Sequence, residues 1–283
     1  MDKRVLTLNF KDTLSALSDL IMPRVCLVCG RALTFRERLL CLPCSLDLPL
    51  TRFETWEHNP MADKYNARIG GLYEPYQRAT ALLHYWHESG YANIPQALKY
   101  GRNFEVGRHF GAMLGRRLAA SPLFADIDLV VPVPLHWTRR LKRGYNQAEI
   151  LARAIARELS SARASDPAGA GAVALAPRLL RRVRRTRTQT RMTIYEKTLN
   201  VSGAFKVRRV HTLVDSGGGM CKKGPKRTYP RLFSGGYAQE IHHILLVDDV
   251  FTTGSTLTAC HDALRKVFGP DVRISLATLS FAG

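Results

Sequence analysis

The run from Ile244 to Thr256, near the end of the chain, constrains the fold more than any other stretch. Its first four residues are all apolar, with no alternating polar face, which is typical of a strand buried on both sides in a parallel sheet. The strand stops at Asp248 and Asp249, and a short polar turn follows. Apolar residues then recur at helical spacing from Leu257 to Phe268. This order predicts an α/β fold with a ligand site at the carboxyl end of the strand.

The polar turn has the composition of a phosphate-binding loop. Backbone N–H groups at the start of a helix bind anions, hydroxyl side chains add donors, and a glycine lets the ligand approach closely. The residues are Thr252, Thr253, Gly254, Ser255 and Thr256. The two carboxylates before the turn would repel a bare phosphate, but they suit sugar hydroxyls or Mg²⁺. We therefore expect a phosphorylated sugar, with Asp248 and Asp249 acting at the sugar.

Two simpler interpretations of this run stay open. The strand could carry the metal-binding carboxylates of a nucleotide hydrolase, although the chain contains no G-x-x-x-x-G-K-[ST] motif. The polar residues could also serve only to cap the helix and form the turn. Capping explains one or two of these residues, but it does not explain why the whole run has this composition.

A second apolar strand, at residues 128–131, ends in a proline-rich and basic loop. Arginine side chains match phosphate oxygens in geometry and charge. The loop therefore predicts a pyrophosphate site beside the acidic pair, and a solvated basic loop is the alternative. Its residues are Val133, Pro134, Leu135, Arg139, Arg140, Lys142 and Arg143. Helices are predicted over 93–100, 104–120 and 146–159, and the basic junction at 98–102 could close over a ligand.

Four of the six cysteines form two Cys-x-x-Cys pairs, Cys26 with Cys29 and Cys41 with Cys44. In a reducing compartment this pattern predicts a structural zinc site with four thiolate ligands. A thioredoxin-type redox centre needs only one such pair. We therefore predict a zinc-ribbon module over 1–65 and a larger domain over 66–283, joined by the polar stretch 51–64.

The net charge of +19 lies almost wholly in the larger domain, because residues 1–65 carry nine Lys/Arg and eight Asp/Glu. Such a surface favours polyanions. An arginine-rich run is the strongest candidate for nucleic-acid binding, with a solvated face as the alternative. A further basic segment, 212–239, precedes the core strand, and no role follows from its sequence. The residues of the candidate run are Arg181, Arg182, Arg184, Arg185 and Arg187.

No apolar run approaches the ~20 residues that span a membrane, and the N-terminus lacks the apolar core of a signal peptide. We therefore expect a cytoplasmic protein.

Several motifs in this order resemble the ComF/GntX family. That resemblance implies a type I phosphoribosyltransferase-like sheet behind a zinc ribbon, with phosphoribosyl pyrophosphate (PRPP) and Mg²⁺ at the acidic pair. It also implies a role in natural transformation, with single-stranded DNA, an uptake helicase and other competence proteins as partners. Lys197 replaces a usual arginine, and the 212–239 segment is atypical of the family. The matching segments are 23–30, 143–147, 188–205 and 248–256.

Three hypotheses remain open from the sequence. The chain is a DNA-uptake factor that binds PRPP and single-stranded DNA, or an active Mg²⁺-dependent phosphoribosyltransferase. In the third hypothesis it is a zinc-ribbon nucleic-acid module that has lost small-ligand binding.

Overall fold

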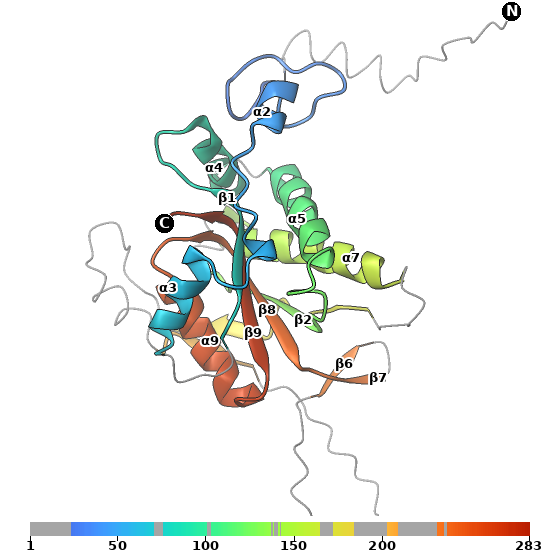
Figure 1. Ribbon diagram of the computed structural model, residues 1–283, viewed down its shortest axis with the longest axis vertical. Helices are drawn as coiled ribbons and strands as arrows, with labels where there is room; N and C mark the ends of the chain where they lie inside the picture. The colour runs from blue at the N-terminus through green and yellow to red at the C-terminus, as the bar shows by residue number, and fades with distance from the viewer. Residues whose placement is uncertain are drawn as a thin grey trace, which may run out of the picture.

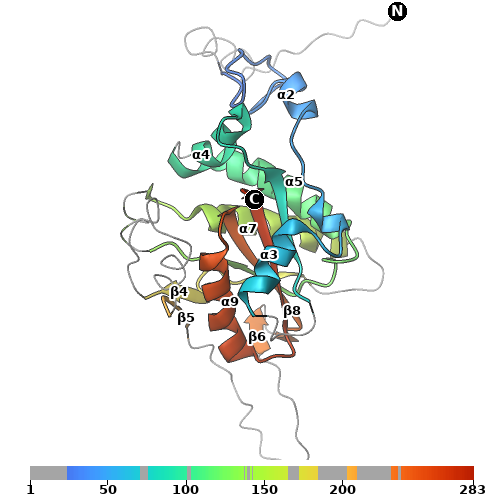
Figure 2. The same cartoon turned by 60° about the vertical axis from the view of Figure 1, so that its left-hand side comes forward.

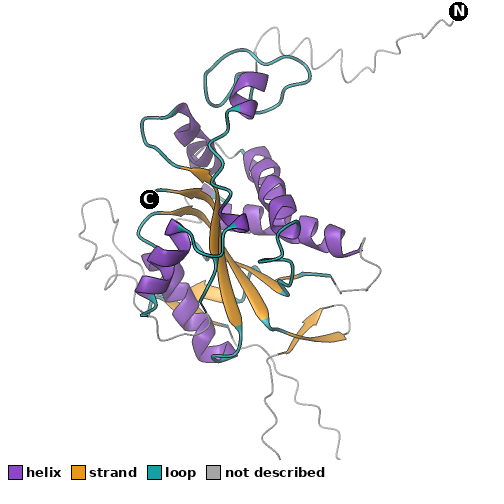
Figure 3. Ribbon diagram, in the orientation of Figure 1, coloured by secondary structure: helices purple, strands orange, loops and turns teal. Residues whose placement is uncertain are grey.

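The computed structural model describes residues 24–70, 76–100, 103–136, 138, 141, 143–164, 172–183, 203–208, 231–234 and 237–283. Its centre is a five-stranded sheet in the order β1-β9-β8-β2-β3, and all neighbouring strands are parallel. Figure 3 shows the strands of this sheet in orange among the helices. The predicted α/β class with a mostly parallel sheet is therefore confirmed. The strands are β1 Ala79–His84, β2 Leu129–Pro132, β3 Ala174–Leu175, β8 His243–Phe251 and β9 Arg273–Phe281.

Strand β8 is central because its first half has no polar side to present to water. Residues Ile244 to Val247 are at most 1% exposed, and they pair with β9 on one side and β2 on the other. Burial on both faces is what the uninterrupted apolar run predicted. The burial ends at Asp248, but the strand does not stop there as predicted, because pairing with β9 continues to Phe251. The two carboxylates therefore lie within the last part of β8, toward its carboxyl end.

Helices cover both faces of the sheet. Helices α5 Phe104–Ala119 and α7 Gln147–Ala164 lie on one face, and α3 Pro60–Arg68 and α9 Ser255–Phe268 lie on the other (Figures 1 and 2). Each face has its own buried cluster of apolar side chains. Glycines let α5 approach α7 closely, since a Cβ at Gly111 would lie 2.9 Å from the Cβ of Ala154. The predicted helices over 93–100, 104–120 and 146–159 are thus confirmed, the first as α4 Asn93–Tyr100.

The stretch 51–64, which we predicted to be a polar connection, is instead part of the folded core. Asn59 caps α3 by accepting hydrogen bonds from the N–H groups of Met61 and Ala62, and Tyr65 is fully buried. Glu54 is 2% exposed and pairs with Arg117 of α5 at 2.6 Å. The sequence looked polar because its polar side chains form buried caps and ion pairs. The boundary at 65 falls inside α3, and the division into 1–65 and 66–283 stays a prediction.

The remaining elements are short. They are α2 Leu42–Leu46, the 3-10 turns η1 Phe53–Thr55 and η2 Gly90–Ala92, and two antiparallel pairs, β4 Leu180–Arg182 with β5 Phe205–Val207 and β6 Arg231–Ser234 with β7 Tyr237–Glu240. The pair β6 and β7 belongs to the basic segment 212–239, most of which lies outside the described residues. Among the helices that the structure describes, none combines the length and apolar character that crossing a membrane requires.

Candidate functional site

The site lies where the chain changes sides of the sheet. Strand β2 continues into α7 on one face, whereas its neighbour β8 continues into α9 on the opposite face. In open parallel sheets, ligands bind in the crevice at such a switch point. The N–H of Val133 donates to the carbonyl of Val247 at 2.8 Å, so the loop after β2 starts beside the acidic pair. The two loops singled out in the sequence therefore begin side by side at the carboxyl ends of β2 and β8, and we call the space between them the crevice.

The acidic pair is partly buried and has a basic partner. The backbone N–H of Asp249 donates to Oδ1 of Asp248 at 2.9 Å, and Lys99 Nζ lies 3.4 Å from Oδ2 of Asp249. Burial and, after it, the charge of the Asp249 carboxylate raise the pKa of Asp248 to about 8, against the opposing effects of the Asp249 N–H and of the charges of Lys99 and Arg182. Near neutral pH, Asp248 therefore holds its proton while the crevice has no ligand.

The phosphate-loop residues form the turn that the sequence predicted, at the start of α9. Gly254 has φ 74°, and a Cβ there would lie 2.8 Å from the Phe251 ring. The hydroxyls of Thr253 and Ser255 are 3.0 Å apart, while Thr252 is exposed and Thr256 half-buried. The aliphatic part of Arg68, from α3, also reaches Gly254. No pattern in the sequence indicates Arg68, because this residue belongs to a distant helix.

The basic loop is only partly within the described residues. Val133 is buried, Pro134 and Leu135 are half-buried, and Arg143 places its guanidinium 5.4 Å from the centre of the Tyr100 ring. Arg139, Arg140 and Lys142 lie outside the described residues. The assignment of this loop to pyrophosphate stays a prediction.

Residues 145–147 hold the basic loop to the end of α4, a role that the sequence did not reveal. Asn146 Nδ2 donates to the carbonyl of Val133 at 3.0 Å, and Gln147 Nε2 donates to the carbonyl of Lys99 at 3.5 Å. The Tyr145 hydroxyl donates to the carbonyl of Leu98. Lys99 therefore enters the site from α4. The basic junction at 98–102 was its only signal in the sequence.

The candidate nucleic-acid residues separate into two groups. Arg181 is exposed on β4. Arg182 is half-buried, with its guanidinium 5.2 Å from the centre of the Phe205 ring, and its charge lowers the pKa of Asp248. Arg182 thus lies within electrostatic reach of the acidic pair. Arg184, Arg185 and Arg187 lie outside the described residues.

The two cysteine pairs come together in a cluster that fits a tetrahedral metal ion. All four Sγ atoms lie within 4.8 Å of one another, and those of Cys29 and Cys41 are 3.6 Å apart. Zinc–sulfur bonds of about 2.3 Å place tetrahedral neighbours roughly 3.8 Å apart. Gly30 has φ 73°, and its N–H donates to the carbonyl of Cys26 at 2.9 Å, which turns the first pair inward.

The chemistry of the cluster also suits a metal. Burial opposes ionisation of Cys26, but the backbone N–H groups of Cys29, Cys41 and Val28 lower its pKa to about 6. Burial and hydrogen bonds with the other thiols raise the pKa of Cys44. One thiolate is therefore available near neutral pH, and a bound cation would ionise the others. The four cysteines can hold a metal ion such as zinc.

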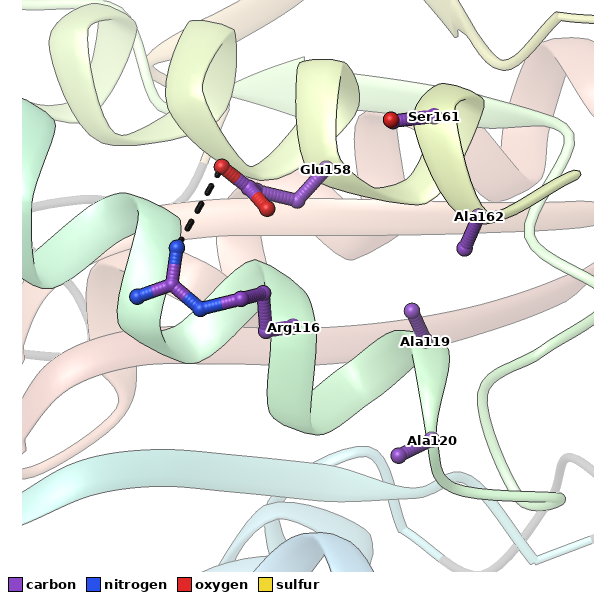
Figure 4. Close-up of a pocket in the computed structure, with 6 residues that line it drawn as sticks. All are labelled: Arg116, Ala119, Ala120, Glu158, Ser161 and Ala162. Atoms are coloured by element: carbon purple, nitrogen blue, oxygen red, sulfur yellow. Dashed lines mark ion pairs between the residues drawn. The ribbon is translucent and has the colours of Figure 1, made fainter. Parts of the chain in front are cut away.

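A hollow of about 400 Å³ lies elsewhere, between the C-terminal ends of α5 and α7 (Figure 4). Its lining consists of three alanines, Ser161 and the ion pair between Arg116 and Glu158, which are 3.4 Å apart. The hollow is open to solvent, and its two charges already neutralise each other. Unlike the crevice between β2 and β8, this hollow does not bring together several charged groups that could bind a ligand, so we assign it no role.

The fold and these two sites define an α/β protein with a mostly parallel sheet, a polar crevice at its switch point and an N-terminal four-cysteine cluster. The chain is 26% identical over 182 residues to Competence protein F of Haemophilus influenzae. The match covers 63% of this chain and 63% of that relative, so it leaves more than a third of the relative unmatched. No family model matches the chain. The relative confirms the resemblance to the ComF family.

Proposed function

We propose that this protein binds PRPP in the crevice between β2 and β8, binds single-stranded DNA on its basic surface, and acts in DNA uptake during natural transformation. The observation that carries the proposal is the convergence of an acidic pair, a phosphate loop and a basic loop at one switch point. The name of the relative, Competence protein F, supports the competence role.

Each part of the crevice suits one part of PRPP. The ribose hydroxyls face Asp248 and Asp249, and the 5′-phosphate accepts hydrogen bonds from the N–H groups and hydroxyls of residues 252–256. The pyrophosphate lies along the loop that starts at Val133 and includes Arg143. Mg²⁺ accompanies PRPP and supplies neutralising charge at the pyrophosphate. The protein itself orients the sugar and balances the phosphate charges.

Calorimetric titration of the full chain with PRPP and Mg²⁺ tests this site. We expect saturable binding by the wild type and at least a tenfold weaker affinity in Asp248→Asn and Asp249→Asn. Glu57→Gln is the matched control, because it also exchanges a carboxylate for an amide, at an exposed position away from the crevice. Failure of the wild type to bind, or equal binding by all variants, would contradict the proposal.

The DNA proposal rests on the arginines around β4. Arg181 is exposed, and four further arginines follow it in the sequence, at 182, 184, 185 and 187. A contact of this kind neutralises DNA phosphates and weakens steeply with salt. Arg182 is better left in place, because its charge acts on the acidic pair and its loss would disturb both sites.

Binding of single-stranded DNA should therefore weaken in a variant with alanine at Arg181, Arg184 and Arg185, and its dependence on salt should become shallower. A control variant with alanine at Arg108, Arg153 and Arg157 removes equal charge from exposed positions on α5 and α7. Equal losses in the two variants would show that binding follows net charge alone, and would exclude the run around β4 as the contact.

Active phosphoribosyl transfer is the second candidate. The acidic pair favours it, because negative charge beside the ribose stabilises an oxocarbenium-like state at the anomeric carbon, and the positive charge that develops there favours ionised Asp248. In that reaction, a bond forms from a nitrogen nucleophile to the anomeric carbon as the bond to pyrophosphate breaks, and the proton of the nucleophile passes to solvent. Release of pyrophosphate from PRPP with a panel of nitrogen acceptors tests it. Rates equal to those of an Asp248→Asn/Asp249→Asn variant would exclude catalysis.

A further inference from the structure

We infer that helix α4 couples the four-cysteine metal centre to the acidic pair, with Lys99 as the positioning residue at the far end. Metal binding at the cysteines would then set the strength of anion binding in the crevice. The inference rests on the proposed function only for the identity of the ligand. The coupling itself follows from contacts at the two ends of α4.

The first end of α4 is held by the metal-binding segment. The Tyr91 hydroxyl donates to the carbonyl of Cys44 at 3.2 Å, and Asn93 Nδ2 donates to the carbonyl of Leu27 at 3.0 Å. Leu27 lies between the first two cysteines, so these contacts reach both Cys-x-x-Cys pairs. Gly90 packs so closely that a Cβ there would lie 2.5 Å from the carbonyl oxygen of Val28. The turn before α4 therefore follows any movement of either cysteine pair.

The second end of α4 enters the crevice. Lys99 Nζ lies 3.4 Å from Oδ2 of Asp249, with the two side chains 26% and 17% exposed. The carbonyls of Leu98 and Lys99 accept hydrogen bonds from Tyr145 and Gln147, respectively. Figure 1 shows α4 between the segment of α2 and the edge of the sheet where β9 ends. The helix thus bridges the metal centre and the acidic pair.

Helix α4 can act as a strut, by which we mean a rigid element whose position is set by contacts at its two ends. Its eight residues span about 12 Å, and an isolated helix of this length is not stable in water. Its position therefore depends on tertiary contacts at both ends. Ile94 and Leu98 are fully buried, in the same apolar cluster as Cys26 and Cys41.

Removal of the metal should loosen this strut. A metal holds the two cysteine pairs together, because thiolates that repel one another share one cation. Without it, the carbonyls of Leu27 and Cys44 lose their fixed separation, and the first turn of α4 loses its anchor. The ion pair between Lys99 and Asp249 is then formed for a smaller fraction of the time. The crevice keeps its two carboxylates but loses a nearby cation, so an anionic sugar binds less tightly.

Hydrogen–deuterium exchange of the full chain tests the coupling without any ligand. We compare zinc-loaded protein, protein stripped with a chelator, and a zinc-loaded Tyr91→Phe/Asn93→Ala variant. Exchange at residues 97–100 should rise at least tenfold after stripping and severalfold in the variant, while α7 stays protected. Tyr76→Phe is the matched control, since it removes a hydroxyl contact with Asp63 instead.

If removal of zinc by the chelator unfolds the whole chain, the zinc-loaded Tyr91→Phe/Asn93→Ala variant still tests the coupling. It retains all four cysteines, and its zinc content is measured directly. Unchanged exchange at 97–100 in the zinc-loaded variant, relative to the wild type, would overturn the coupling. Faster exchange there, with α7 unchanged, supports it.

Titration with PRPP and Mg²⁺ then tests Lys99 as the relay. Tyr91→Phe/Asn93→Ala should weaken binding at least fivefold in the wild-type background, but by less than about twofold, roughly the limit of non-additivity for uncoupled sites, when Lys99→Ala is already present. Equal weakening in both backgrounds would overturn the role of Lys99. If the wild type binds no PRPP, the proposed function fails, whereas the exchange comparison still supports or overturns the coupling.

Discussion

Replacement of Asp248 by asparagine should stabilise this protein, and the gain should grow with pH. Burial raises the pKa of this carboxyl from 3.8 in the unfolded chain to about 8 in the folded protein. Between these values the unfolded chain releases a proton that the folded protein retains. The contribution of Asp248 to the stability of the wild type therefore falls as pH rises from about 4 to about 8, and asparagine removes this penalty.

The size of the effect follows from the pKa shift. Each pKa unit corresponds to about 1.4 kcal/mol, and neutral pH lies about three units above 3.8, which gives a ceiling of about 4 kcal/mol at pH 7. Asp248 is only half-buried, so solvent reduces the penalty, and we expect about 1–3 kcal/mol. Asparagine keeps Oδ1 as an acceptor for the N–H of Asp249, so no hydrogen bond is lost.

Urea denaturation of both proteins at pH 5, 6, 7 and 8 measures the difference. Contributions of other titrating groups cancel in the comparison, and the advantage of Asp248→Asn should rise steadily across the series. Glu57→Gln, at an exposed position, should stay within about 0.5 kcal/mol of the wild type throughout. An advantage that does not change with pH, or a variant less stable than the wild type at pH 8, would refute the reasoning.

Three other substitutions have defined outcomes. Gly254→Ala places a Cβ 2.8 Å from the Phe251 ring, at a residue whose φ of 74° disfavours a side chain. Thermal unfolding should therefore show that the free energy of unfolding falls by about 2 kcal/mol, and an unchanged melting temperature would contradict this. Arg117→Met leaves the buried Glu54 carboxylate without its partner at 2.6 Å, and should cost about 3–5 kcal/mol in urea denaturation; adding Glu54→Gln should recover part of that loss. Cys41→Ser should lower the zinc content below one ion per chain, measured by atomic emission; full retention would show that Cys41 is not a ligand.

Features of the fold that depend on residues close together in the sequence could be predicted. The uninterrupted apolar run of β8 identifies a strand buried on both sides, and the first charged residue after it, Asp248, marks where burial of the strand ends, although the strand itself continues to Phe251. The glycine of the phosphate loop marks the turn into α9, and the spacing of the cysteines indicates a metal cluster. Each of these signals lies within a few residues.

Apparent polarity misled the prediction for 51–64. That stretch is rich in polar residues, yet Asn59 caps α3 and Glu54 pairs with Arg117 inside the core. Composition cannot distinguish a solvated side chain from a buried one with a partner, because the partner belongs to a distant element. The same reason separates two neighbours in the sequence, because Arg181 is exposed whereas Arg182 is half-buried over Phe205, within electrostatic reach of Asp248.

The sequence by itself determined the fold class, the acidic pair with the turn into α9 that follows it, and the four-cysteine cluster, because short-range pattern and spacing encode all three. Only the tertiary structure decided which chemistry surrounds the acidic pair. Lys99 reaches Asp249 from α4, and Tyr145 and Gln147 hold the end of that helix in place. These contacts join segments far apart in the chain, and their geometry exists only once the sheet has brought the carboxyl ends of β2 and β8 together.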